Sequence, residues 1–104
     1  MPKVIFTIDY EIPAEKKEVY LSLIKELKTL LTAEGLENYS VYETKGKNHH
    51  YHEQYTFSSE EAFEAFDDDQ NERINILINK LNDMTTNGST RYTTFYEIAE
   101  NNPL

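Results

Sequence analysis

The stretch KVIFTIDYEI, residues 3–12, decides the fold together with the residues that follow it. Its apolar side chains alternate with polar ones, which predicts a half-buried β-strand. Pro13 ends this strand, and leucines then recur at helical spacing over residues 14–34. Residues 37–45 alternate again, so the first part of the chain is predicted to form strand, helix and strand.

The same order of elements returns in the second part of the chain. We predict a strand over residues 49–57, a helix over 59–86 and a strand over 90–98. The order βαββαβ is the ferredoxin-like arrangement of the α+β class, an antiparallel four-stranded sheet with two helices on one face. We expect one domain over residues 1–104. Because the helices cover one face only, the other face is predicted to need a cover.

Local signals set the expected helix ends. Val19 belongs to the predicted buried stripe of the first helix, and Gly35 is expected directly after its end. Ser58 is predicted to cap the second helix, with a glutamate three residues on completing a capping box. The acidic run at 67–69 interrupts the pattern and predicts a kink or short break near Asn71.

The hairpin between residues 37 and 57 fixes the faces of the sheet. Pairing Tyr39 with Tyr55 and Val41 with Glu53 keeps the apolar residues together. The helix-covered face then carries Val4, Phe6, Ile8, Tyr10, Tyr39, Val41, Tyr51, Tyr55, Phe57, Tyr92, Tyr96 and Ile98, and also Glu53. The opposite face carries Ile5, Thr7, Asp9, Glu11, Ser40, Tyr42, Thr44, His50, His52, Gln54, Thr56, Arg91, Thr93, Phe95 and Glu97. This second face is mixed, which is typical of a sheet that pairs with a second copy around a polar-lined space.

Composition excludes several classes of function. The chain has no cysteine, which excludes disulfides and thiolate chemistry. The net charge is −9, and residues 53–72 hold eight acidic side chains and no basic one. Nucleic acids and anionic membranes need the opposite sign, so we expect neither as a partner. The sequence contains no apolar run of membrane-spanning length and no signal peptide, so a cytoplasmic location is expected.

The best candidate site lies on the mixed face. His50 and His52 project from the same side of a strand, about 6.5–7 Å apart along it. The other candidate residues are Gln54, Tyr42, Asp9 and Arg91. Two imidazoles with carboxylates suit an organic ligand, acid–base chemistry or a divalent metal. The alternative is a structural histidine pair at a dimer interface. No catalytic residue is assigned, and we expect no cofactor and no metal.

Glu53-Gln54-Tyr55-Thr56-Phe57, followed by Ser58-Ser59-Glu60-Glu61-Ala62-Phe63-Glu64-Ala65-Phe66, resembles the dimeric α+β barrel superfamily, in particular its antibiotic biosynthesis monooxygenase-like branch. Phe66 stands where many of those proteins have histidine. The resemblance implies a homodimer of face-to-face sheets and a small organic ligand. Some proteins of this superfamily oxidise or isomerise small aromatic or quinone-like compounds without metal or flavin, others bind haem, and many have no known activity, so the resemblance leaves the chemistry open.

A second resemblance, at Met1-Pro2 and the strand after it, is to the tautomerase superfamily. It implies that Pro2, if N-terminal, acts as a base or nucleophile. Three hypotheses follow. The protein is a barrel that binds a small molecule between its two sheets, with monooxygenase-like or isomerase-like chemistry. Alternatively, it is a non-catalytic structural or regulatory homodimer, or a tautomerase that uses Pro2.

Overall fold

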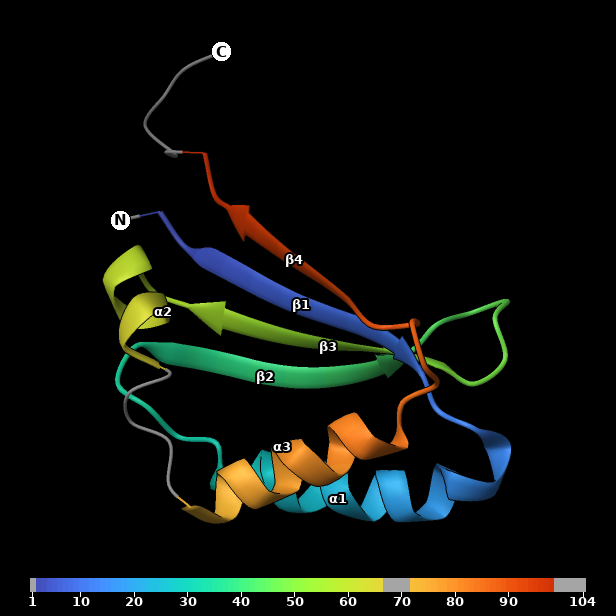
Figure 1. Cartoon of the computed structure of the whole chain (residues 1–104). Coiled ribbons are helices and arrows are strands. Elements are labelled where there is room, and N and C mark those ends of the chain that lie inside the picture. Colours follow the sequence, from blue (N-terminus) through green and yellow to red (C-terminus); the bar gives the residue numbers. More distant parts are fainter. Residues whose placement is uncertain (1, 67–71, 99–104) are drawn as a thin grey trace.

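The computed structural model describes residues 2–66 and 72–98 (Figure 1). The strands are β1 (Val4–Glu11), β2 (Leu36–Glu43), β3 (His50–Phe57) and β4 (Arg91–Tyr96). The helices are the 3₁₀ turn η1 (Ala14–Lys16), α1 (Lys17–Leu30), α2 (Glu60–Phe66) and α3 (Glu72–Met84). All strand pairs are antiparallel, in the order β2-β3-β1-β4. The predicted ferredoxin-like α+β fold is confirmed.

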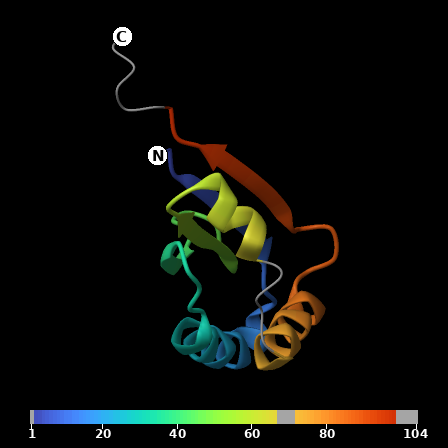
Figure 2. The ribbon, with the colours of Figure 1, turned by 90° about the vertical axis from the view of Figure 1, so that its left-hand side faces the viewer.

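The predicted hairpin register is also confirmed. Tyr39 pairs with Tyr55, and Val41 pairs with Glu53. Helices α1 and α3 pack side by side on one face of the sheet, and the opposite face carries no helix of the described residues (Figures 1 and 2). The core lies between the helices and the sheet and is built from Val4, Tyr10, Ile12, Tyr20, Leu23, Ile24, Leu27, Leu31, Tyr39, Tyr51, Tyr55, Phe57, Ile74, Leu77, Leu81 and Met84.

Strand β4 lies at the edge of the sheet that α1 and α3 leave open (Figure 2). The predicted helix side of β4 is right, but its side chains are not covered: Tyr92 is 63% exposed and Tyr96 is 60% exposed. Tyr92 instead stacks on the ring of Phe6, with 6.1 Å between the ring centroids. The uncovered edge therefore leaves an opening beside α3.

Details of the first helix, and the cap of α2, differ from the sequence-based prediction. The first helix ends at Leu30 and not at 34, because Leu31 adopts an extended backbone and its side chain enters the core. Gly35 therefore lies in a turn before β2. Val19 is 61% exposed, because the inward face of α1 is centred on Tyr20. The cap of α2 is Ser59 and not the preceding serine, since its Oγ accepts the N–H of the third helical residue at 3.1 Å.

The single second helix predicted over 59–86 is two helices, α2 and α3. The kink predicted near Asn71 falls within residues 67–71, outside the described part of the chain. Within the described residues, no helix is both long enough and apolar enough to span a bilayer.

Candidate functional site

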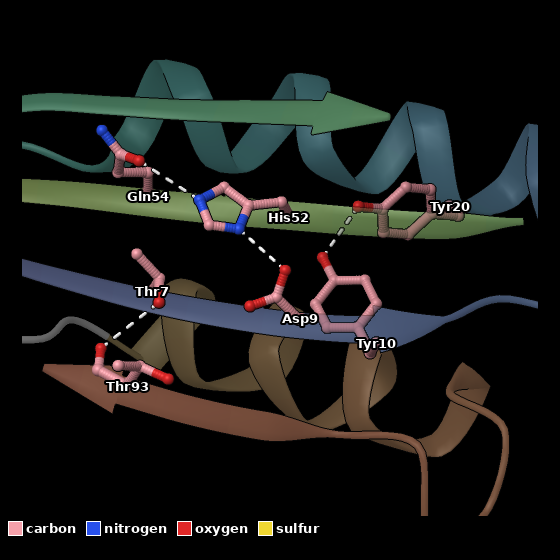
Figure 3. Close-up of polar contacts among 7 residues, drawn as sticks. All are labelled: Thr7, Asp9, Tyr10, Tyr20, His52, Gln54 and Thr93. Atoms are coloured by element: carbon pink, nitrogen blue, oxygen red, sulfur yellow. Dashed lines mark hydrogen bonds and ion pairs between the residues drawn. The ribbon is translucent and has the colours of Figure 1, made fainter. Parts of the chain in front are cut away.

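Three of the predicted site residues meet on the uncovered face of the sheet. Asp9 of β1 and His52 of β3 are direct partners across the strand pair. Nδ1 of His52 lies 2.8 Å from Oδ1 of Asp9, and its Nε2 lies 3.2 Å from Oε1 of Gln54 (Figure 3). Partial burial alone would lower the pKa of His52, but the hydrogen bonds to Asp9 and Gln54 and the negative charge of Asp9 raise it above the usual value. The geometry favours an imidazolium ion that donates to both neighbours.

The other predicted residues surround this trio less closely. The ring of Tyr42 lies 6.1 Å from that of His52. Nδ1 of His50 is engaged locally, 2.9 Å from the carbonyl oxygen of Asn48. Arg91 pairs with Asp9 in the β1–β4 register.

Asp9, His50 and Arg91 line a hollow of about 450 Å³ at the end of the sheet. Within residues 2–66 and 72–98, no three histidine, aspartate or glutamate side chains gather in a metal-binding group. The predicted residues therefore divide into a hydrogen-bonded trio and a more open hollow beside it.

A second cavity, which the sequence did not reveal, lies on the helix side of the sheet between β1, β3, α2 and α3. Its volume is about 350 Å³, within the range of small-molecule pockets. Tyr92 of β4 lies at its open edge. The lining is mainly aromatic and aliphatic: Phe6, Ile8, Tyr10, Glu53, Tyr55, Phe63, Phe66, Ile78, Leu81, Asn82, Thr90 and Tyr92.

Glu53 is the one carboxyl group in this lining. Its side chain is 1% exposed. The Tyr39 hydroxyl donates to Oε1 at 2.7 Å, and the Tyr55 hydroxyl donates to the same oxygen at 3.5 Å. Oε2 is buried and has no hydrogen-bond partner. Burial raises the pKa of Glu53 above its usual range, against the smaller opposing effect of the tyrosine hydroxyls.

Further tyrosines surround this carboxyl group. The hydroxyls of Tyr10 and Tyr20 are 2.7 Å apart, and their rings meet edge to face (Figure 3). Burial, followed by the nearby Glu53, raises the pKa of Tyr10. The available sequence signal was the register itself, which placed one glutamate among the tyrosines of the helix-covered face.

Pro2 lies apart from both places. It lines a separate hollow of about 370 Å³ with Ser59, Glu60 and Glu97. No lysine, arginine or histidine is among the residues that line this hollow.

Similar solved structures show which class of fold this is. A conserved protein from Methanosarcina mazei has a TM-score of 0.80 and 15% identity, with 94% of this chain and 95% of that one covered. SnoaB, a cofactor-independent oxygenase from Streptomyces nogalater, has a TM-score of 0.72 and 13% identity, with 94% and 93% covered. An antibiotic biosynthesis monooxygenase has a TM-score of 0.68 and 20% identity, with 95% and 98% covered.

The chain thus shares its fold with structures named as antibiotic biosynthesis monooxygenases, as the resemblance noted in its sequence predicted. Neither a protein-family model nor a curated protein sequence matches the chain. At these identities the likeness is one of fold, and the chemistry must be argued from the site.

Proposed function

We propose that the protein binds a small organic molecule in the cavity around Glu53 and oxidises it in a monooxygenase-like reaction. The observation that carries the proposal is an aromatic cavity lined by a residue whose buried carboxyl oxygen has no partner. The fold shared with a cofactor-independent oxygenase supports the reaction class. We favour this cavity over the trio on the uncovered face because Asp9, His52 and Gln54 already hydrogen-bond one another.

The chemistry of such a reaction constrains the substrate. A substrate that supplies its own electrons can be oxidised at a CH₂ group by O₂ alone. One oxygen atom becomes the new carbonyl oxygen, and the other leaves as water with the two hydrogens. The apolar lining excludes water from the reacting group, and the aromatic rings hold a flat substrate in place.

The uncovered face of the sheet is proposed to bind a second copy of the chain. Phe95 is 53% exposed and Tyr42 is 51% exposed on this face, beside the polar trio. A stable homodimer usually buries about 1,600 Å² in total, and a four-stranded face on each protomer is of the right order. The His50, Arg91 and Tyr42 side chains would then lie at the dimer interface or in a space between the two sheets, where they provide a second place for a ligand.

Two measurements test the proposal. Oxygen consumption and product mass are followed with a panel of phenols and aromatic ketones, and binding is followed by isothermal titration calorimetry. Ile78→Trp, which fills the cavity, is expected to abolish both binding and oxygen uptake. Leu21→Trp, at an exposed position of α1, is the control and is expected to leave both unchanged. Binding without oxygen uptake would contradict the oxygenase proposal and would favour an isomerase or a protein that only binds the ligand.

The dimer is tested separately by light scattering of purified protein. Phe95→Lys is expected to yield monomers, whereas Val19→Lys, also well exposed but on α1, is the control and is expected to remain dimeric. A dimer that binds no small molecule would support the alternative, a structural or regulatory homodimer.

A further inference from the structure

Glu53 combines deep burial with an incomplete set of hydrogen bonds. It projects from the central strand β3 into the cavity lining, and its side chain is 1% exposed. The residues that line the cavity include no lysine, arginine or histidine. The nearest basic neighbour along the chain, His52, points to the opposite face of the sheet, where it contacts Asp9. An ionised carboxylate here would be a buried charge without a cation.

The hydrogen bonds indicate where the proton of a neutral carboxyl group lies. Oε1 accepts the hydroxyl proton of Tyr39 at 2.7 Å, and Tyr55 approaches the same oxygen at 3.5 Å. Oε1 therefore acts as the carbonyl-like oxygen of the acid, and the proton belongs on Oε2. Because Oε2 has no partner among the described residues, its O–H is a donor without an acceptor. An unsatisfied buried donor costs free energy, so a ligand that supplies an acceptor gains binding free energy there.

We propose that Oε2 of Glu53 donates a hydrogen bond to an uncharged carbonyl group of the ligand, and that this contact selects carbonyl compounds over carboxylates. The inference rests on the ligand occupying the cavity, as proposed above. The carbonyl oxygen completes the hydrogen bonds of the acid, and the rings of Phe6, Phe63 and Phe66 contact the rest of the ligand. A carboxylate in the same place would lose its hydration without gaining a cation.

Three probes of nearly equal size separate these effects: methyl naphthyl ketone, ethylnaphthalene and naphthoate. The ketone offers an acceptor, the hydrocarbon offers none, and the carboxylate carries a charge. For the wild-type protein we expect the ketone to bind roughly tenfold more tightly than the hydrocarbon, the effect of one hydrogen bond that satisfies a buried donor. Naphthoate is expected to bind at least about a hundredfold more weakly than the ketone.

Two variants test the role of the carboxyl group itself. Glu53→Gln is neutral and of the same shape: its amide oxygen can accept from Tyr39 while its NH₂ group donates to the ketone. It is therefore expected to keep the preference for the ketone. Glu53→Leu has no donor and is expected to bind ketone and hydrocarbon equally. The infrared stretch of the bound ketone provides a second readout, since hydrogen bonding moves it to lower frequency in the wild type and in Glu53→Gln, but not in Glu53→Leu.

The outcomes distinguish this inference from the function on which it rests. If all three probes bind the wild type equally, or if Glu53→Leu keeps the ketone preference, the cavity binds ligands but Glu53 does not select them, and the inference is wrong. If no probe binds any form of the protein, both the cavity function and this inference are overturned. If Glu53→Leu does not fold, the three wild-type affinities, Glu53→Gln and the infrared frequency still decide.

Discussion

Replacement of Glu53 by glutamine is expected to make the protein more stable at neutral pH, and the gain is expected to grow with pH. Below its usual pKa of 4.5 the carboxyl group carries a proton in both the folded and the unfolded states. Above that value the unfolded chain releases the proton, whereas burial keeps it bound in the folded protein. The stability of the wild type should therefore fall as pH rises, until the raised pKa of the folded protein is reached.

The size of the effect follows from the single proton involved. Each pH unit in this range is expected to cost the wild type about 1.4 kcal/mol relative to Glu53→Gln. The amide retains the bond from Tyr39, so the remaining difference between the two proteins is independent of pH. The raised pKa of His52 also makes stability depend on pH, but over the range in which folded Glu53 stays neutral this contribution is common to both proteins and cancels in the difference.

The assay is urea unfolding followed by circular dichroism, at intervals between about pH 5 and about pH 8. Glu43→Gln, which removes a carboxyl group from an exposed position of β2, corrects for the general loss of one negative charge. Parallel stability curves for the wild type and Glu53→Gln would refute the reasoning, because they would show that Glu53 is ionised in the folded protein as well.

Three further predictions concern two glycines with positive φ angles, the carboxylate that contacts His52, and the tyrosine that contacts Glu53. Gly46→Ala is expected to cost about 1 kcal/mol, because its φ of +84° is unfavourable for alanine and the surrounding space is open. Gly35→Ala, with a φ of +85°, is expected to cost clearly more in the same urea assay, because the new methyl group would overlap a side chain of α2; equal costs would contradict this. Asp9→Asn is expected to lower the pKa of His52, measured by NMR titration of the imidazole. The stability that the Asp9–His52 pair provides is present below the usual histidine pKa of 6.5 and is lost as pH rises through the raised pKa of His52. An unchanged pKa of His52 in the variant would show that Asp9 does not stabilise the protonated imidazole. Tyr39→Phe is expected to destabilise the protein by about 1–3 kcal/mol in thermal or urea unfolding, since the buried carboxyl group loses its shortest hydrogen bond; a stability equal to that of the wild type would show that water replaces the hydroxyl.

The sheet was predictable because alternation specifies strands strongly. The pairing of Tyr39 with Tyr55 follows from a simple rule: a shift by one residue would turn every apolar side chain toward the wrong face. For the same reason the sequence predicted that Asp9, His52 and Gln54 share one face.

The cavity was not predictable in the same way, because it depends on where the helices stop covering the sheet. The chain pattern over 59–86 is helical throughout, and it does not show that α2 and α3 are separate elements. Nor does alternation along β4 show that Tyr92 lies beyond the reach of α3 and lines an opening. Alternation thus predicts the face of the sheet on which each side chain lies, but it does not predict how deeply that side chain is buried.

Glu53 shows how a conflict between sequence pattern and fold can mark a functional position. The alternation of the neighbouring strand residues agrees with this register. Apolar or tyrosine side chains fill the positions around the glutamate on its face of the sheet. An isosteric neutral residue would satisfy the same tyrosine without a titratable group, and stability alone would favour it at neutral pH. Natural sequences depart from such local consistency mainly at sites of function, where the departure is compensated elsewhere. The tyrosine hydroxyls at Oε1 provide part of that compensation, and the unpartnered Oε2, on a residue that lines a cavity of about 350 Å³, is where a ligand would provide the rest.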